Sequence, residues 1–111
     1  MAGFNEILGL FPGDGEATVL LDTRAEHEVI PGTIHFAVLA TLAEVAAARA
    51  VAAAVVPTNV SLALIARARP GRLEGRGRVL KLGRRLAFAE GEVLQDGELV
   101  AKAAVTFAVL G

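Results

Sequence analysis

One carboxylate stands out in the longest apolar stretch of this 111-residue sequence. Glu44 lies within residues 36–56, where the one other charged residue is Arg49. Apolar surroundings disfavour the charged form of a carboxyl group and therefore raise its pKa. A carboxylate tuned in this way is suited to act as a general base. The alternative interpretation is that Glu44 faces solvent on an exposed helix surface, as most helical glutamates do.

The start of the same stretch is the second candidate feature. Gly32-Thr33-Ile34-His35 leads into Phe36 and Ala37, whose backbone amides would lie in the first turn of a helix. First-turn amides have no partner within the helix and sit at the positive end of its dipole. They can therefore hold a carbonyl oxygen that gains negative charge during a reaction.

These two features cannot act on the same atom within one chain. Glu44 lies eight residues after Phe36, which is about 12 Å along a helix axis. The reach of a hydrogen bond is about 3 Å. Two antiparallel copies could each offer Glu44 to the helix start of the other, so a catalytic site here is expected to be shared across a homodimer.

Positive charge is concentrated downstream, although the formal net charge is only −1. Eight cations lie within residues 67–85 against the single acid Glu74, whereas residues 1–30 hold six acids and Arg24. The cations are Arg67, Arg69, Arg72, Arg76, Arg78, Lys81, Arg84 and Arg85. They either bind an anionic ligand or form a solvated strand face paired with Glu90, Glu92 and Glu98.

Composition excludes several classes of function. The sequence has no Cys, Trp or Tyr, which rules out disulfides and thiolate sites and argues against stacking on nucleic acid. His27 and His35 alone do not suggest a metal site, and we expect no cofactor. An alanine-rich run with a central Glu44 and Arg49 is too costly as a membrane span. Residues 1–9 do not resemble a secretory signal, so we expect a soluble cytoplasmic protein without membrane or nucleic-acid partners.

The predicted elements form one α+β domain over residues 1–111. A lead of residues 1–15 precedes a strand at 16–23, a long central helix at 35–56, and a meander of four strands at 58–109. Alanine is the best helix former, and Pro57 would close the helix. Asp96-Gly97 is a strong signal for a type I′ hairpin turn. A single helix packed against one antiparallel sheet is the expected architecture.

The segment from Gly32 to Glu44 resembles the hotdog-fold acyl-CoA thioesterases related to the phenylacetate-degradation thioesterase. That family carries a catalytic Asp or Glu nine residues after a His, which is the spacing of His35 and Glu44. The resemblance extends over residues 16–110 and includes Val60-Ser61-Leu62, Arg69-Pro70, Gly77-Arg78-Val79, Gly83-Arg84-Arg85 and residues 97–101. It looks closest to a less characterised thioesterase-like branch.

Two departures accompany this resemblance. Val29 stands where the family has Asn, and Phe36 and Ala37 replace the two glycines that follow the His. Backbone amides survive the loss of glycine, but the ring of Phe36 would reshape the approach to them. A non-catalytic hotdog module that binds acyl-CoA is therefore the alternative to an enzyme.

The resemblance implies a dimeric hotdog fold, or a dimer of dimers, that hydrolyses an acyl-CoA or a related thioester. Glu44 would act as general base or nucleophile, while the partner's helix start binds the carbonyl oxygen. His35 would position that helix start or polarise the carbonyl, or merely cap and pack. The expected contacts with substrate, water or Glu44 involve Gly32, Phe36, Ala37, Asn59 and Ser61. The phosphates of CoA would meet Lys81, Gly83, Arg84 and Arg85.

Overall fold

The computed structural model describes residues 3–111, so the first two residues of the predicted lead lie outside the described part. A 3₁₀ turn at Ala25–His27 separates β2 from β3. The elements in chain order are α1 (Phe4–Leu8), β1 (Phe11–Pro12), β2 (Thr18–Asp22), β3 (Glu28–Ile30), β4 (Thr33–Ile34), α2 (Phe36–Val51), β5 (Val55–Leu64), β6 (Arg72–Leu82), β7 (Leu86–Gln95) and β8 (Glu98–Val109).

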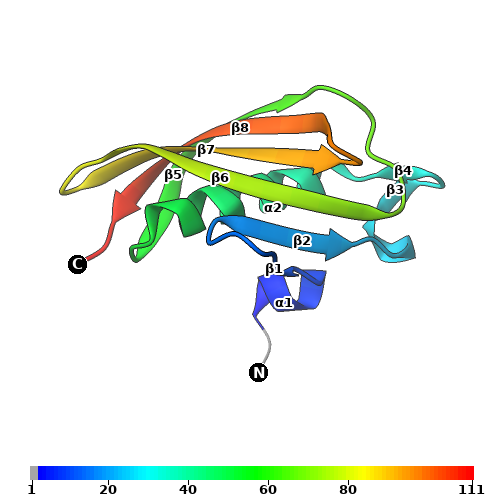
Figure 1. Ribbon diagram of the computed structural model, residues 1–111, viewed down its shortest axis with the longest axis horizontal. Coiled ribbons are helices and arrows are strands. Elements are labelled where there is room, and N and C mark those ends of the chain that lie inside the picture. Colours follow the sequence, from blue (N-terminus) through cyan, green and yellow to red (C-terminus); the bar gives the residue numbers. More distant parts are fainter. Residues whose placement is uncertain (1–2) are drawn as a thin grey trace.

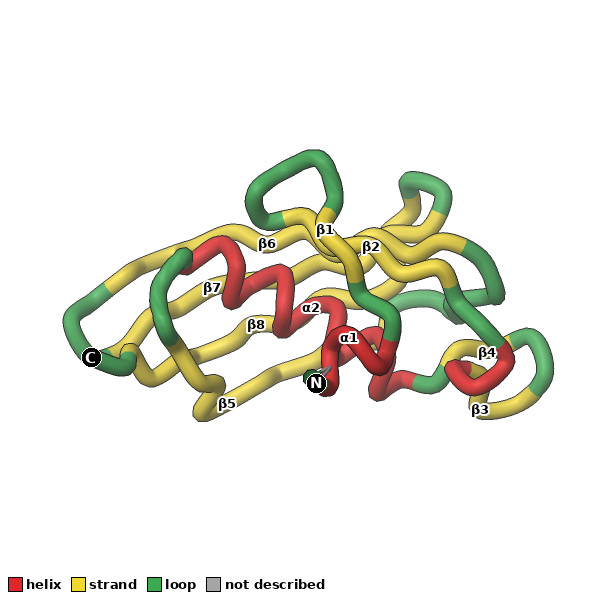
Figure 2. The backbone as a smooth tube through the Cα atoms, turned by 90° about the horizontal axis from the view of Figure 1, so that it is seen from below, coloured by secondary structure: helices red, strands yellow, loops and turns green. Residues whose placement is uncertain are grey.

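One antiparallel sheet in the order β1-β2-β6-β7-β8-β5 forms the main layer, and α2 lies against one of its faces (Figures 1 and 2). β3 and β4 form a separate small hairpin. The predicted α+β architecture of one long helix on an antiparallel sheet is confirmed. The hairpin at Asp96-Gly97 also has the positive φ angles of a type I′ turn, 52° and 80°.

The central helix is shorter than predicted. Helix α2 ends at Val51, because Ala52 adopts a left-handed conformation with φ of 56°. Val55 and Val56, which we expected to be helical, pair instead with Val109 and Ala108 as the first residues of β5. The high helix propensity of alanine leaves no stop signal in the sequence before Pro57. The β-branched Val55 and Val56 instead favour a strand, which they form by pairing with β8.

The four-strand meander is also corrected. β6, β7 and β8 follow one another as antiparallel neighbours, but β5 pairs with β8 at the edge of the sheet. The chain then crosses to β6, whose other neighbour is β2. Turn signals in the sequence define the hairpins, yet they carry no information about which edge the first strand occupies.

The backbone of α2 rests directly on the sheet. A Cβ atom on Gly77 would lie 1.9 Å from the carbonyl oxygen of Ala46, and one on Gly91 would lie 1.9 Å from that of Ala43. Larger residues of α2, Val38, Leu39 and Leu42, are buried beside this contact. Glycines on β6 and β7 therefore set the helix close to the sheet and fix where its outer face lies.

Within residues 3–111, no helix is both long and apolar enough to cross a membrane.

Candidate functional site

Glu44 lies half-buried on the side of α2 that faces away from the sheet. It lines a groove of about 710 Å³ together with Asn5, Val45, Ala48 and Arg49. Among the described residues, none forms a hydrogen bond or an ion pair with its carboxylate. Partial burial raises the pKa of Glu44 above its usual value. The structure thus gives Glu44 neither a salt-bridge role nor full exposure.

The start of α2 leaves one amide free. The Nδ1 atom of His35 accepts a hydrogen bond from the Ala37 N–H at 3.0 Å, and the Val38 N–H donates to the His35 carbonyl. In the part of the chain that is described, the Phe36 N–H has no acceptor. His35 is therefore the helix cap. The expectation that the Ala37 amide is available to a substrate is not met, since the cap already occupies it.

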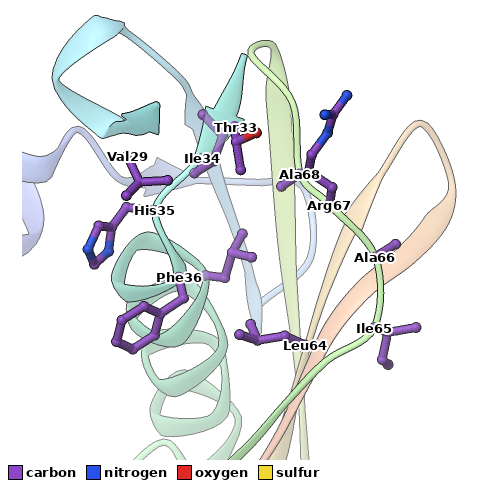
Figure 3. A pocket seen from close by; sticks show the side chains of 11 residues that line it. Val29, Thr33, Ile34, His35, Phe36, Leu64, Ile65, Ala66, Arg67 and Ala68 are labelled. Atoms are coloured by element: carbon purple, nitrogen blue, oxygen red, sulfur yellow. The ribbon is translucent and has the colours of Figure 1, made fainter. Parts of the chain in front are cut away.

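An apolar cavity of about 450 Å³ opens beside this free amide (Figure 3). The rings of His35 and Phe36 stack with centroids 4.9 Å apart, and Phe36 is 54% exposed. The lining residues are Val29, Thr33, Ile34, His35, Phe36, Leu39, Leu64, Ile65, Ala66, Arg67 and Ala68. Val29, at the position of the family's Asn, contributes apolar surface to this cavity.

Gly32 shapes the loop before the helix and offers no free donor. It lies between β3 and β4 with φ of 87°, and its N–H donates to Glu28 Oε1 at 2.7 Å. The His35 N–H in turn donates to the carbonyl of His27 at 2.9 Å. These bonds hold the segment that leads into α2, so Gly32 positions the helix start instead of contacting a substrate through its amide.

Glu44 and the helix start do not meet within one chain. The groove of Glu44 and the cavity beside Phe36 have no lining residue in common. This agrees with the separation of eight residues along a straight helix. A single reacting group can contact both only if they come from two chains.

Asn59 and Ser61 lie on the wrong face of the sheet for the role we expected. They pair with Thr106 and Ala104, whereas the intervening Val60 pairs with the buried Val105 on the helix side. Side chains alternate between the two faces of a strand, so Asn59 and Ser61 point away from α2. An irregularity in pairing between Pro57 and Asn59 sets this register, and the sequence pattern does not reveal it.

The structure divides the basic block into two groups. Arg72 pairs with Asp22 at 2.7 Å, Arg76 pairs with Glu74 at 2.8 Å, and Arg78 pairs with Glu90. Arg69 lies 3.8 Å from Asp96, and Lys102, outside the block, contacts Glu90 and Glu92.

Four cations remain, and no carboxylate of the described residues lies within ion-pairing distance of them. They are Arg67, Lys81, Arg84 and Arg85. Lys81 and the two arginines are exposed around the β6–β7 turn, where the Gly83 N–H donates to the Leu86 carbonyl. Solvated pairing thus accounts for half of the block, and three cations of the β6–β7 turn have no carboxylate partner among the described residues.

Asn5 and His27 make contacts that the sequence did not predict. Asn5, from the lead, lines the groove of Glu44. His27 is 3% exposed, with its Nδ1 accepting from the Arg24 N–H and its Nε2 donating to the Leu8 carbonyl. No local signal in the sequence connects the lead to the middle of α2, so neither contact was predictable. Among residues 3–111, no group of three potential metal ligands comes together.

The antiparallel sheet over one long helix, with an isolated carboxylate on that helix, defines the hotdog class predicted from the sequence. The family model of the thioesterase superfamily matches residues 31–102. The chain belongs to the thioesterase superfamily. None of the curated proteins matches it significantly.

Solved structures resemble it over nearly its whole length. A variant of the phenylacetic acid degradation protein PaaI from Thermus thermophilus is 31% identical, with a TM-score of 0.86 over 96% of this chain and 98% of that one. Another Thermus thermophilus protein is 33% identical, with a TM-score of 0.86 over 99% and 100%. A Bacillus halodurans protein solved with CoA is 21% identical, with a TM-score of 0.85 over 96% and 74%.

Proposed function

We propose that this protein hydrolyses an acyl-CoA or a related acyl thioester at a site shared between two subunits. The proposal is supported by two groups of α2 that have no hydrogen-bond partner among the described residues. Within residues 3–111, Glu44 is a partly desolvated carboxylate without a partner, and the Phe36 N–H is an unpaired donor at the positive end of the helix. Membership in the thioesterase superfamily supports the reaction type.

In the proposed reaction, Glu44 of one subunit takes a proton from a water molecule that attacks the thioester carbonyl carbon. The carbonyl oxygen becomes negative and is held by the Phe36 N–H of the partner subunit and by the helix dipole. Collapse of this tetrahedral species breaks the carbon–sulfur bond, and the thiolate takes the proton from Glu44. Direct attack by Glu44, through a mixed anhydride that water then hydrolyses, is the variant of this mechanism.

The free edge of the sheet supports self-association. β5 is an edge strand, so the outer side of its backbone has no neighbouring strand in the sheet. Val60 and Leu64 point to the helix side of the sheet, yet they are 43% and 55% exposed because α2 does not reach over them. A second copy placed antiparallel along this edge would cover both residues and bring the two helices together.

The β6–β7 turn supplies the proposed contacts to CoA. Lys81, Arg84 and Arg85 can donate charge-assisted hydrogen bonds to phosphate oxygens, with Gly83 in the turn between them. The Bacillus halodurans protein has the same fold and was solved with CoA. Because the sequence identity is low, this likeness establishes the fold alone. The proposed contacts to CoA therefore depend on the unpaired cations of the turn.

Hydrolysis of a panel of acyl-CoAs by the wild type and by Glu44→Ala tests the proposal. We expect turnover by the wild type and a loss of at least about 100-fold in the variant, because the general base is removed. Equal rates in both proteins would contradict the role of Glu44. Sedimentation of the wild type as a monomer would contradict the shared site.

A non-catalytic acyl-CoA binding module is the second candidate. It is favoured by the apolar environment of the free amide, where Val29 and the exposed ring of Phe36 replace polar or small family residues. Tight binding of CoA without turnover of any acyl-CoA would establish this alternative.

A further inference from the structure

The short helix α1 is held on the body by hydrogen bonds to its backbone and by the side chain of Leu8, which packs partly buried against the core. None of its residues is buried, and Phe4 and Ile7 are 68% and 64% exposed. Even so, the Arg24 guanidinium donates to the Ile7 carbonyl at 2.7 Å, and the buried His27 ring bonds the Leu8 carbonyl at 2.7 Å. These contacts hold the C-terminal end of α1, while its first four residues, Asn5 among them, stay exposed.

Asn5 is the residue of α1 that lies at two grooves of the body. This residue lines the groove of Glu44, and it also lines an adjoining groove with Glu6, Val45 and Arg49. In the tube view α1 lies over α2 on the side away from the sheet (Figure 2). The lead therefore places Asn5 on the same groove as the carboxylate to which the proposed function assigns the chemistry.

The other polar side chain of the groove is already engaged. Arg49 donates from Nε to the carbonyl of Glu16 at 3.2 Å, which ties its guanidinium to the segment before β2. The remaining lining residues, Val45, Ala48 and residues 52–55, are apolar. Arg49 in this groove and Glu6 in the adjoining one are the charged side chains that the described chain places around Glu44 and Asn5.

We propose that Asn5 is a positioning residue for Glu44, which holds the attacking water between its side-chain amide and the carboxylate. An asparagine amide offers two donors and one acceptor and adds no charge. A groove of about 710 Å³ has room for a water molecule with two polar partners. Fixing that water aligns it for attack, which a lone and freely rotating carboxylate cannot do.

The kinetic part of this inference rests on the proposed function. Asn5→Ala is expected to lower kcat by about tenfold while KM stays within about twofold, because the lost contact orients water and does not bind the thioester. Ile7→Ala, in the same short helix but outside the groove, is the matched control and should retain the wild-type kcat. An unchanged kcat in Asn5→Ala, beside an inactive Glu44→Ala, overturns the inference and leaves the proposed function intact.

A second readout does not need turnover. The carbon-13 shift of the Glu44 carboxyl group is followed against pH in the wild type, in Asn5→Asp and in Ile7→Asp. A second carboxylate within the groove should raise the titration midpoint of Glu44 well above that in Ile7→Asp, because like charges disfavour ionisation. Equal midpoints in the two variants would overturn the placement of Asn5 on Glu44, whether or not the protein hydrolyses thioesters.

Discussion

At the scale of single residues, Glu44 and His35 turn out to have different kinds of role. Glu44 has no partner among the described residues and is partly desolvated, which disfavours its charged form. Nδ1 of His35 is engaged, because it accepts from the Ala37 N–H and caps the helix, and the ring stacks on Phe36. His35 and Glu44 have the nine-residue spacing of the family. In the proposed function Glu44 performs the chemistry, and His35 holds the helix start in place.

The pH dependence of activity should follow Glu44. Hydrolysis requires its ionised form, so kcat/KM is expected to fall as the pH drops through the raised pKa of this carboxyl group. Glu44→Gln should remove this acid limb together with at least about 100-fold of the activity. A pH–rate profile of the wild type checks the limb, and a flat profile would contradict it.

The stability of the fold should show the opposite trend. A raised pKa means that the folded state binds the proton more tightly, so this contribution to stability is present at acid pH and is lost as the pH rises through the pKa of Glu44 in the folded state. Glu44→Gln should therefore unfold at the same urea concentration as the wild type, or a higher one, at neutral pH. The difference should vanish in acid, and a clear loss of stability at neutral pH would contradict the interpretation.

At the scale of elements, the contact between α2 and the sheet decides where the site faces. Gly77 and Gly91 let the helix backbone approach the strands, and this approach turns the opposite side of α2, with Glu44, away from the sheet. Val38, Leu39 and Leu42 are buried on the sheet side of α2. The sequence pattern did not indicate that glycines would make up the other half of the contact.

Gly77→Ala is the corresponding prediction. The added Cβ would lie 1.9 Å from the Ala46 carbonyl oxygen, so helix or strand must move. We expect a loss of about 1–3 kcal/mol in the free energy of unfolding, measured with urea. Gly3→Ala is the control, since a Cβ at that position meets no atom of the described residues within 4 Å. Equal urea midpoints for the two variants would show that the helix is not held as closely as described.

At the scale of the whole molecule, the near-neutral net charge conceals a division between paired and unpaired cations. Arg72, Arg76 and Arg78 are matched by acids on the same or neighbouring strands, whereas the cations of the β6–β7 turn have no such partner in the described part of the chain. The free edge at β5 is the second unmatched feature of the monomer. Both fit a molecule that is completed by a second copy and by an anionic substrate.

The shared site predicts complementation between two inactive variants. Glu44→Ala removes the base, and Phe36→Pro removes the proposed oxyanion donor. Proline is tolerated at the first helical position, and His35 already has the extended conformation, with ψ of 138°, that a following proline requires. Random pairing makes half of the dimers mixed, and each mixed dimer has one intact site of two, so about a quarter of the wild-type activity should return.

Phe36→Ala, which keeps the amide, is the control for loss of the ring. If mixed dimers form and remain as inactive as either parent, the site is not shared in this way.

The unpaired turn predicts a salt-sensitive effect on substrate binding. The double variant Arg84→Ala with Arg85→Ala should raise KM for an acyl-CoA by about tenfold at low salt with little change in kcat, since phosphate contacts are lost. The difference should shrink at high ionic strength because exposed charges are screened. Arg78→Ala is the matched control, as Glu90 already neutralises this arginine. Similar KM values for the two variants would contradict a binding role for the turn.

The sequence by itself determined the class of fold, the long helix with its one carboxylate, the Asp96-Gly97 turn and the separation of Glu44 from the helix start. These follow from local propensity, side-chain periodicity and helix rise, which act over a few residues. Even so, the helix end at Val51 escaped prediction, because the competing strand partner of Val55 lies far along the chain.

Only the tertiary structure decided that β5 takes the sheet edge, that Asn59 and Ser61 face away from α2, that the cap occupies the Ala37 amide and which arginines are paired. It also brought Asn5 to the groove of Glu44. Strand order, register and contacts between distant segments depend on the packing of the whole chain, in which many weak interactions are satisfied together. A local pattern can therefore specify an element and its chemically distinctive residue, but not the neighbour that the fold places beside it.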